Sequence, residues 1–431
     1  MKKRNEADPT ASNINNNNWG PVIGAASLGL LITAMSITMP HWMAQRNAVG
    51  CDSFCQGSLT SLRSACSLTG AVLTGKWSDS KSWSRFGGAR RLSLWAGVLA
   101  AAVSMRLAYK ADTVSALQLS VMPAALLQQN LSVLKAVFSE YRVSSEGERA
   151  ASAGMLGMAA GLALMVGPAL GATLFPTYEG AVNAGYLCLI TASILIGILP
   201  VIETKQAQAT SVTKPGFLSF LDVPSARSPA AVFLLTCRVL STLSFHIFQT
   251  IWTVSLRDRF HFQPADYGRF MSMVGLFLAL SQGFATKFIL DCCCKNSANA
   301  GRQRVRLLVT CFFIVGFARF LAYMTDNLVA IYVLFAVMVT AMGVTATVLT
   351  ADSTQIAAPD ELGSFFGLQA AIENGAGLAG PLIGGALGAF VHPVKAPLAA
   401  VLTITALLVT MVGMGYDDTV LQHNKKRAKV D

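Results

Sequence analysis

Charged residues are scarce in this sequence. Asp, Glu, Lys and Arg make up 13% of its 431 residues, while hydrophobic residues make up 53%. An ordinary soluble domain carries about 25% charged residues, so this chain has too few to cover a water-exposed surface. Apolar stretches of about 18 or more residues recur instead, and each is long enough to cross about 30 Å of hydrocarbon as a helix. The composition therefore predicts an integral membrane protein that crosses the bilayer many times.

Other features are missing as well, and each absence excludes a class of protein. The strict polar and apolar alternation of membrane β-barrels does not occur. No GxxxxGK[ST] loop is present to hold nucleotide phosphates, and no catalytic Ser/His/Asp set or zinc-ligand spacing marks the loops. We therefore expect no enzyme, no metal site and no cofactor. The first 18 residues also lack the apolar core of a signal peptide.

Basic residues outnumber acidic ones, and the formal net charge is +11. They lie in short clusters between apolar runs, such as the loop with Arg90 and Arg91 and the C-terminal KKRAK. Cytosolic loops of membrane proteins are rich in Lys and Arg, so these clusters place both termini in the cytosol. The expected partner is the lipid bilayer, and no nucleic acid is expected. One loop, with Arg257 and Arg259, falls on the predicted outer side and opposes this orientation.

The apolar runs predict about twelve spanning helices. They lie near residues 19–43, 57–77, 92–109, 113–138, 151–175, 184–202, 230–254, 267–290, 305–323, 328–350, 362–391 and 397–416. The expected units are a disordered cytosolic tail (1–18), a six-helix bundle (19–202), a cytosolic linker (203–229), a second six-helix bundle (230–416) and a basic cytosolic tail (417–431). Within the linker, GFLSFLDV is either a short helix on the membrane surface or a plain connection. The predicted fold class is an all-α membrane protein.

The nine cysteines fall into three groups. Cys51 and Cys55 lie in the first outer loop, where they either pair or stay free. Cys292–Cys294 follow one another in a predicted cytosolic loop, as reduced thiols or as palmitoylation sites. The remaining four lie inside apolar runs and are interpreted as core thiols, namely Cys66, Cys188, Cys237 and Cys311.

One glycine-rich stretch occurs twice. GLALMVGPALG at 161–171 and GAGLAGPLIGG at 375–385 superpose when Gly167-Pro168 is laid on Gly380-Pro381, 213 residues further along. A proline removes one helical hydrogen bond, and spaced glycines let a neighbouring helix approach closely. The two copies indicate homologous halves, and we expect the contact between the halves on these two helices. The residues expected to make it are Gly161, Gly167, Pro168, Gly171, Gly380, Pro381 and Gly384.

Six helices, a linker and six more helices, with similar loops after the second and the eighth, resemble the major facilitator superfamily. The family's signature between helices 2 and 3 matches Gly75, Asp79, Gly88, Arg90 and Arg91, with about six additional residues before the arginines. The resemblance covers nearly the whole chain after residue 18. It implies two pseudo-symmetric six-helix bundles whose cytosolic ends are locked by this loop, around a cavity lined by helices 1, 4, 7 and 10.

Two further matches bear on function. The helix 5 stretch around Gly167 and Pro168 matches a signature of proton-coupled drug antiporters in this family. The segments WSD, LSVLKAVFSE and GER, with Arg238, are similar to a tetracycline-resistance-like eukaryotic branch that includes organic-cation-transporter-like solute carriers. The helix 1 Asp and helix 4 Arg of related exporters are missing, so the case for antiport is weaker than the helix 5 signature alone implies.

A charge at membrane depth costs several kcal/mol unless it is paired or wetted, so such residues are the first site candidates. Glu373 is interpreted as the one carboxylate well inside an apolar run and as the candidate proton carrier, and Arg238 in helix 7 is a second charged candidate. Alternatively, Arg238 reaches the interface or pairs with a loop acid, and Glu373 only binds Arg238 or backbone at a cytosolic gate. Arg319 and Arg106 lie near outer helix ends and are interpreted as interface anchors.

Uncharged polar residues supply the remaining candidates. His246, Gln249 and Trp252 follow at spacings of three, which places them near one helix face. Gln128, Gln129, Asn130 and Asn374 add hydrogen-bonding groups at depth, either for substrate or for contacts between helices.

The resulting hypothesis is a secondary transporter that moves a small organic solute by alternating access. A cationic or amphipathic solute is among the options, and proton coupling is left open. We expect a monomer in the plasma membrane or an organelle membrane. The alternative is a facilitator-fold sensor or scaffold without transport, which the missing helix 1 and helix 4 charges favour.

Overall fold

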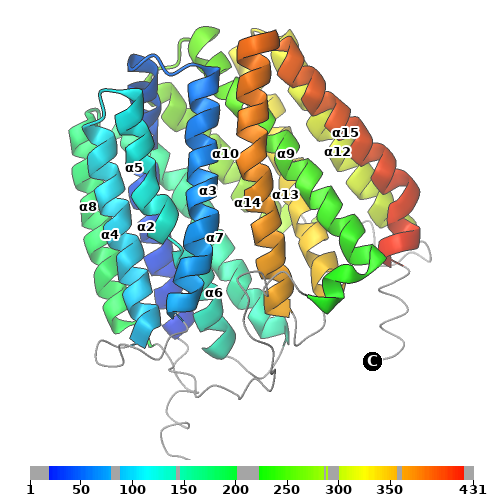
Figure 1. The fold of residues 1–431 in the computed structure, drawn as a ribbon, viewed down its shortest axis with the longest axis horizontal. Coiled ribbons are helices and arrows are strands. Elements are labelled where there is room, and N and C mark those ends of the chain that lie inside the picture. The colour runs from blue at the N-terminus through cyan, green and yellow to red at the C-terminus, as the bar shows by residue number, and fades with distance from the viewer. Residues whose placement is uncertain are drawn as a thin grey trace, which may run out of the picture.

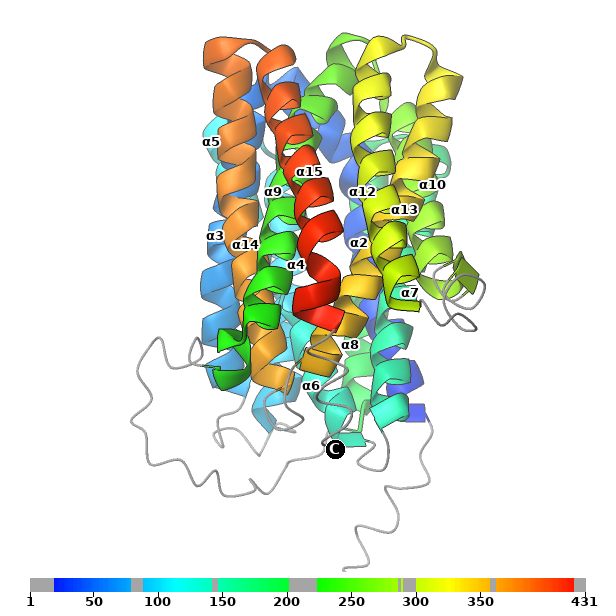
Figure 2. The ribbon, with the colours of Figure 1, turned by 90° about the vertical axis from the view of Figure 1, so that its right-hand side faces the viewer.

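The computed structural model describes residues 19–78, 88–141, 146–200, 223–285, 288–289, 300–356 and 362–421. These residues are helical almost throughout, and the long helices stand side by side with similar axis directions (Figure 1 and Figure 2). The expected N-terminal tail, most of the linker with GFLSFLDV, the Asp79 loop, the Cys292–Cys294 loop and most of the basic tail lie outside the described residues.

Among the described residues, seven helices precede the linker. They are α2 (Trp19–Ala48), α3 (Ser53–Ser78), α4 (Gly88–Tyr109), α5 (Val114–Leu127), α6 (Asn130–Tyr141), α7 (Glu146–Thr173) and α8 (Tyr178–Ile198). After the linker come η3 (Pro224–Arg227), α9 (Pro229–Asp258), α10 (Pro264–Leu280), η4 (Ser281–Ala285), α12 (Ala300–Met324), α13 (Leu328–Ile356), α14 (Leu362–Ala386), η5 (Leu387–Val391), α15 (Lys395–Tyr416) and η6 (Asp417–Leu421). The short loops at 49–52, 110–113, 174–177, 259–263, 325–327 and 392–394 join helices at one end of the molecule, here called the outer end.

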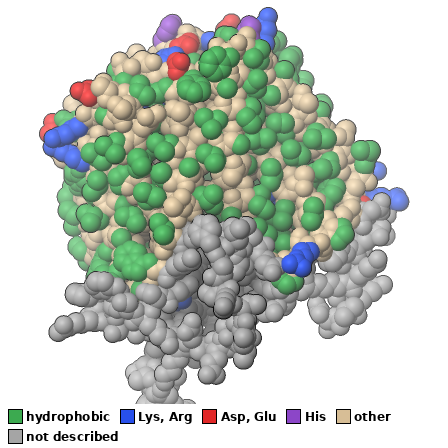
Figure 3. Space-filling view, viewed as in Figure 1, with side chains coloured by type: hydrophobic (Ala, Val, Ile, Leu, Met, Phe, Trp, Pro, Cys, Tyr) green, Lys and Arg blue, Asp and Glu red, His purple; other side chains and the backbone are tan. Residues whose placement is uncertain are grey.

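Within the described ranges, nine helices are long and apolar enough to cross a membrane. Three other helices stand where spans were expected. Two of them, α5 and α10, have 14 and 17 residues, and α3 carries many serines and threonines. Hydrophobic side chains cover the middle of the face shown in Figure 3, while charged ones gather toward its rims. This distribution is what a hydrocarbon belt around the helices requires.

Local capping decides where several helices begin. The Thr177 hydroxyl accepts a hydrogen bond from the backbone N–H of Gly180, so α8 begins at Tyr178. Helix 6 was expected to begin near Ala184, and this expectation was wrong because the cap and the turn before it recruit another six residues. Ser228 caps α9 in the same way, with a proline at the first helical position.

The fourth expected helix, 113–138, is broken in two. α5 ends at Leu127 and α6 starts at Asn130. The backbone N–H of Gln129 bonds to the carbonyl of Leu127. The Ala125 carbonyl, which this N–H would reach in a continuous helix, instead accepts a hydrogen bond of 3.2 Å from the Gln129 side-chain amide. Because a side chain satisfies the carbonyl that a helical N–H would have used, the chain can leave the helix there without an orphaned polar group. The result is a half-helix that starts at membrane depth.

The first Gly-Pro stretch, on α7, packs within its own half. Gly167 lies against the hydroxyl of Ser36, and Gly171 lies against the carbonyl of Ile37, both on α2. A methyl group at either glycine would overlap those atoms. Ser36 also donates to the carbonyl of Ala163 at 3.1 Å, which fixes the two helices in register.

The second stretch, on α14, makes the corresponding contact in the other half. Gly380 lies 2.8 Å from the Cβ of His246, and Gly384 lies 3.1 Å from the Cα of Ile247, each measured from an added Cβ. Both neighbours belong to α9, which is the first helix after the linker, as α2 is the first helix of the chain. The repeated sequence thus makes a repeated contact, helix 5 on helix 1 and helix 11 on helix 7.

The contact between the halves was expected on the two helices that carry these stretches, and both helices do pack across the boundary. α7 packs across the boundary on α10, and α14 packs across it on α3, as Figure 1 shows for α3 and α14. Gly161 contacts Ala279, and the backbone of Gly275 lies close to Leu164. Each Gly-Pro helix therefore has two close faces, because glycines occur on both, and its partner across the boundary is a helix from the opposite half.

Candidate functional site

Arg238 on α9 and Glu373 on α14 face each other inside the second half. Their closest nitrogen and oxygen atoms are 3.5 Å apart, and the Glu373 side chain is one-third exposed while that of Arg238 is largely buried. Arg238 also donates to the Ala346 carbonyl at 3.2 Å and to the Thr350 hydroxyl at 2.5 Å, both on α13. The arginine thus joins three helices, and its contact with Glu373 is the pairing that the sequence had left open as an alternative.

The Glu373 carboxylate has a second partner one turn earlier on its own helix. The Gln369 amide donates to the same carboxylate oxygen at 3.0 Å, and the Gln369 carbonyl accepts from the buried Ser353 hydroxyl at 3.3 Å. This polar chain crosses from α14 to α13. Protonation of Glu373 would remove the negative charge that holds Arg238, so the network can change its contacts with a single proton.

A more deeply buried carboxylate, Asp352, was not among the candidates predicted from the sequence. Asp352 is fully buried, pairs with Arg304 of α12 at 2.6 Å, and accepts a hydrogen bond from the Tyr416 hydroxyl of α15. Glu373 was expected to be the one carboxylate well inside an apolar run. Asp352 was not counted among the candidates because helix 10 was expected to end at Thr350, whereas α13 continues to Ile356. The continuous run TATVLTADSTQI was the signal for a longer helix.

Arg319 on α12 is not an interface anchor as expected. Its side chain is turned inward with 3% exposure, it donates to the Ser244 hydroxyl at 2.6 Å, and it stacks 5.1 Å over the Phe248 ring. The expectation was wrong because it used only the position of Arg319 near a helix end. The face of the helix also decides whether an arginine can reach the membrane interface. Arg106 on α4 is exposed, as an anchor would be, and lies over Tyr109.

His246, Gln249 and Trp252 do not share one environment on α9. His246 is half-buried beside Gly377, Gln249 is exposed, and Trp252 is buried among aromatic rings, including Phe335 at 4.7 Å. Each step of three residues turns about 60° short of a full circle, so two steps separate His246 from Trp252 by about 120°. Trp252 therefore belongs to the aromatic core, and Gln249 stays the accessible member of the group.

The helix 4 amides hold helices together. Gln129 donates to the Ser67 carbonyl of α3 at 3.3 Å, and buried Asn130 donates to the Leu94 carbonyl of α4 at 3.0 Å. Gln128 and Asn374 are half-buried, and no hydrogen bond of their side chains was found in the described part of the chain. These two amides are thus the ones still available to a ligand.

The predicted gating loop is described at its ends. Arg91 donates to the Leu199 carbonyl at 2.6 Å, at the C-terminal end of α8, where a cation is favoured. Arg90 is half-buried on α4, Gly75 lies within α3, and Asp79 is outside the described residues. Arg91 therefore ties α4 to α8 within the first half.

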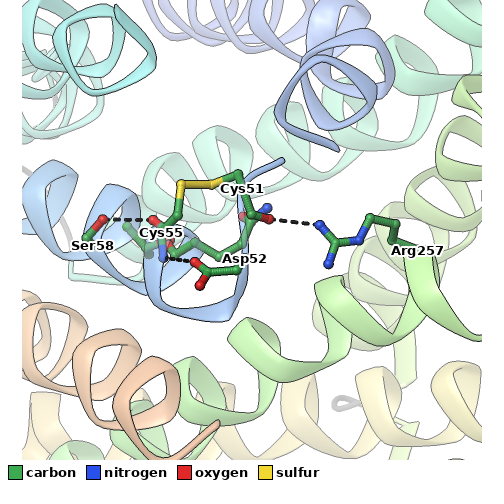
Figure 4. The surroundings of a disulfide bond; sticks show 7 residues. Cys51, Asp52, Cys55, Ser58 and Arg257 are labelled. Atoms are coloured by element: carbon green, nitrogen blue, oxygen red, sulfur yellow. Dashed lines mark hydrogen bonds between the residues drawn. A yellow bond between two sulfur atoms is a disulfide. The ribbon is translucent and has the colours of Figure 1, made fainter. Parts of the chain in front are cut away.

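The outer end is closed by contacts between the halves. Cys51 and Cys55 form a disulfide that fixes the turn before α3, and Arg257 of α9 donates to the Cys51 carbonyl at 2.9 Å (Figure 4). Asn47 of α2 donates to the Tyr267 hydroxyl of α10 at 3.2 Å. The sequence had left the two cysteines either paired or free, and the structure pairs them.

The arginines that opposed the predicted orientation are neutralised at this end. Arg257 pairs with Asp258 at 2.6 Å, and Arg259 pairs with Asp326 at 2.7 Å. A loop whose cations are matched by neighbouring acids carries little net charge, so it weighs little against the basic clusters of the other end.

Comparison with known proteins defines the class first: this is a multi-pass integral membrane protein with a transporter fold. The chain belongs to the Major Facilitator Superfamily, whose profile matches residues 21–381. It is 26% identical to human solute carrier family 67 member A1 over 382 residues, which make up 85% of this chain and 84% of the human protein. The all-α fold with two pseudo-symmetric six-helix bundles is that of the superfamily.

Solved transporter structures share the fold. The human organic anion transporter MFSD10 is 18% identical with a TM-score of 0.61, covering 91% of this chain and 99% of that one. The nucleoside transporter NupG is 13% identical with a TM-score of 0.63, covering 96% and 99%. A bacterial homologue of the lysosomal transporter Spinster, inward-facing and occupied, is 13% identical with a TM-score of 0.63, covering 98% and 96%. The particular branch expected from the short sequence matches is not singled out by these relatives.

Proposed function

We propose that this protein is a secondary transporter that moves a small organic solute by alternating access. The observation that carries the proposal is the polar network of Arg238, Glu373 and Gln369 at membrane depth, next to helices that form the boundary between the halves. Such groups are costly in hydrocarbon and are retained where a substrate or an ion passes.

The packing between the halves supports the same mechanism. The outer end is held by few polar contacts, chiefly Arg257 to Cys51 and Asn47 to Tyr267, while α7 and α10 meet through small residues. Small-residue surfaces allow two rigid bundles to rock against each other with little change in packing. We infer that breaking the outer contacts opens the site to the other side.

Proton coupling through Glu373 is the finer part of this proposal. A protonated carboxyl would release Arg238, and the arginine would then rely on Ala346 and Thr350 of α13. Protonation of Glu373 would thus change which helices Arg238 joins. Proton coupling requires such a difference in contacts between two conformational states.

The test is a substrate screen with the purified full-length protein in liposomes across an imposed pH gradient. Counterflow of at least one labelled organic solute, blocked by excess unlabelled solute, is expected. Saturable ligand binding without counterflow would favour the sensor or scaffold instead. The relatives leave the solute open, because one is described as an organic anion transporter and another as a nucleoside transporter.

A further inference from the structure

Arg63 lies near the middle of α3 and was not considered in the sequence interpretation. Its side chain is exposed, and no hydrogen bond or ion pair of its guanidinium is found with any described residue. An isolated cation in the middle of a spanning helix is unfavourable unless water or a ligand reaches it. The face of α3 on which it lies therefore decides its role.

That face is turned to the interior of the first half. Arg63 is one turn from Ser67 and two turns from Gly70, which contact Gln129 and Leu126. Phe54, an exposed hydrophobic residue of the same helix, is nine residues away and so points to the opposite side. The guanidinium thus lies on the side of α3 that faces α5, opposite to the side that carries the exposed Phe54.

A second unpaired arginine lies nearby on α2. Arg46 is 5% exposed, its buried Nε has no hydrogen-bond partner, and its guanidinium stacks 4.1 Å over the Trp42 ring. Arg46 is close enough to Arg63 and to Tyr267 to interact electrostatically with both. Within the described part of the chain, no carboxylate forms an ion pair with either arginine.

The start of α6 adds positive charge about one turn deeper than Arg63. The first N–H groups of a helix have no intrahelical partner and carry the positive end of the helix dipole. Gln129, just before this start, bonds to Ser67, one turn from Arg63. Broken helices that point such ends toward anionic substrate groups are a known device of transporters.

We propose that Arg63, Arg46 and the N-terminal end of α6 form an anion-binding site, and that the transported solute is a small organic anion with a carboxylate, sulfonate or phosphate group. The anion-binding site does not depend on the proposed transport function. Only the statement that the bound anion is transported rests on that function. Two like charges without an acid repel each other, and an anion between them turns this repulsion into two charge-assisted hydrogen bonds. The cationic solute allowed by the sequence would meet repulsion here.

Four ligands with one ring system test the charge requirement. They are 2-naphthoate and 2-naphthyl phosphate as anions, 2-naphthamide as the neutral member and 2-naphthylmethylammonium as the cation. Thermal unfolding of the purified full-length protein should shift upward with at least one anion and not with the other two, since a ligand that binds the folded state stabilises it. A shift with the cation or the amide as large as with the anions, or no shift with either anion, overturns the proposal.

Three variants localise the effect. Arg63→Gln should weaken anion binding by about tenfold or more, and Arg63→Lys should retain part of it. Arg106→Gln removes an exposed arginine near the same end of the first half and should change nothing. Unchanged anion binding in Arg63→Gln, in protein that elutes as a single species, would remove Arg63 from the site.

Counterflow of labelled 2-naphthoate separates this inference from the transport proposal. Anion binding without counterflow keeps the site and removes transport. Counterflow of the naphthylmethylammonium cation without anion binding keeps transport and removes the anion site.

Discussion

Arg257 of α9 donates a hydrogen bond of 2.9 Å to the backbone carbonyl of Cys51, and this contact joins the two halves of the chain at the outer end (Figure 4). The acceptor is held in place by the Cys51–Cys55 disulfide. A side chain from the second half thus closes on a rigid turn of the first half, which makes the contact easy to break without disturbing either bundle.

Arg257→Gln should weaken closure of the outer end. A hydrogen bond from a charged donor contributes about 1 kcal/mol when it is partly exposed, so its loss shifts the closed population by about fivefold. Spin labels introduced as noncanonical amino acids at Lys110 and Leu328, exposed residues at the outer end, would report the distance between the halves. The variant should show a larger fraction of long distances between the two labels.

The control for this experiment is Arg269→Gln. Arg269 is exposed and pairs with Asp266 on its own helix, so its loss should leave the distance distribution as it is. Identical distributions for Arg257→Gln and the parent protein would show that this contact does not hold the outer end closed.

Replacing both Cys51 and Cys55 by serine should destabilise the protein modestly. The disulfide closes a very short loop, for which chain entropy gives about 2 kcal/mol. Thermal unfolding should show the same decrease in the parent protein under reducing conditions, and reductant should not affect the double serine variant. A reductant effect that persists in that variant would point to other thiols.

Glu373→Gln should remove the dependence of transport on the pH gradient while expression stays normal. The amide keeps the shape and can still accept from Gln369, but it neither titrates nor holds Arg238 by charge. The measurement is solute flux in liposomes with and without a pH gradient. Proton-driven flux that is equal in parent and variant would exclude Glu373 as the proton carrier.

The Gly-Pro helices offer a matched pair of glycines. Gly171→Ala would push a methyl group into the Ile37 carbonyl of α2 and should cost about 1–3 kcal/mol. Gly375→Ala, on α14, meets nothing within 4 Å and should be neutral or slightly stabilising, because alanine favours the helix. Unfolding temperatures of the two variants measure the difference, and equal values would contradict the close packing of α7 on α2.

The sequence by itself determined the membrane class, most helix positions and the internal repeat. These follow from local properties: a bilayer of fixed thickness demands long apolar helices, and a Gly-Pro stretch has the same effect wherever it stands. It also offered the pairing of Glu373 with Arg238 as one alternative, because few charges occur at depth and each needs a partner.

The tertiary structure alone decided which polar groups meet and which face the interior. The break between α5 and α6 depends on Ser67 of another helix as well as on Gln129, and the inward turn of Arg319 depends on Ser244. Arg63 and Arg46 come within electrostatic reach of each other although α2 and α3 make few direct contacts, and hydropathy carries no information on that pairing. Apolar periodicity in a bundle surrounded by lipid marks the spans but not their inner faces, so the candidate site became visible only in three dimensions.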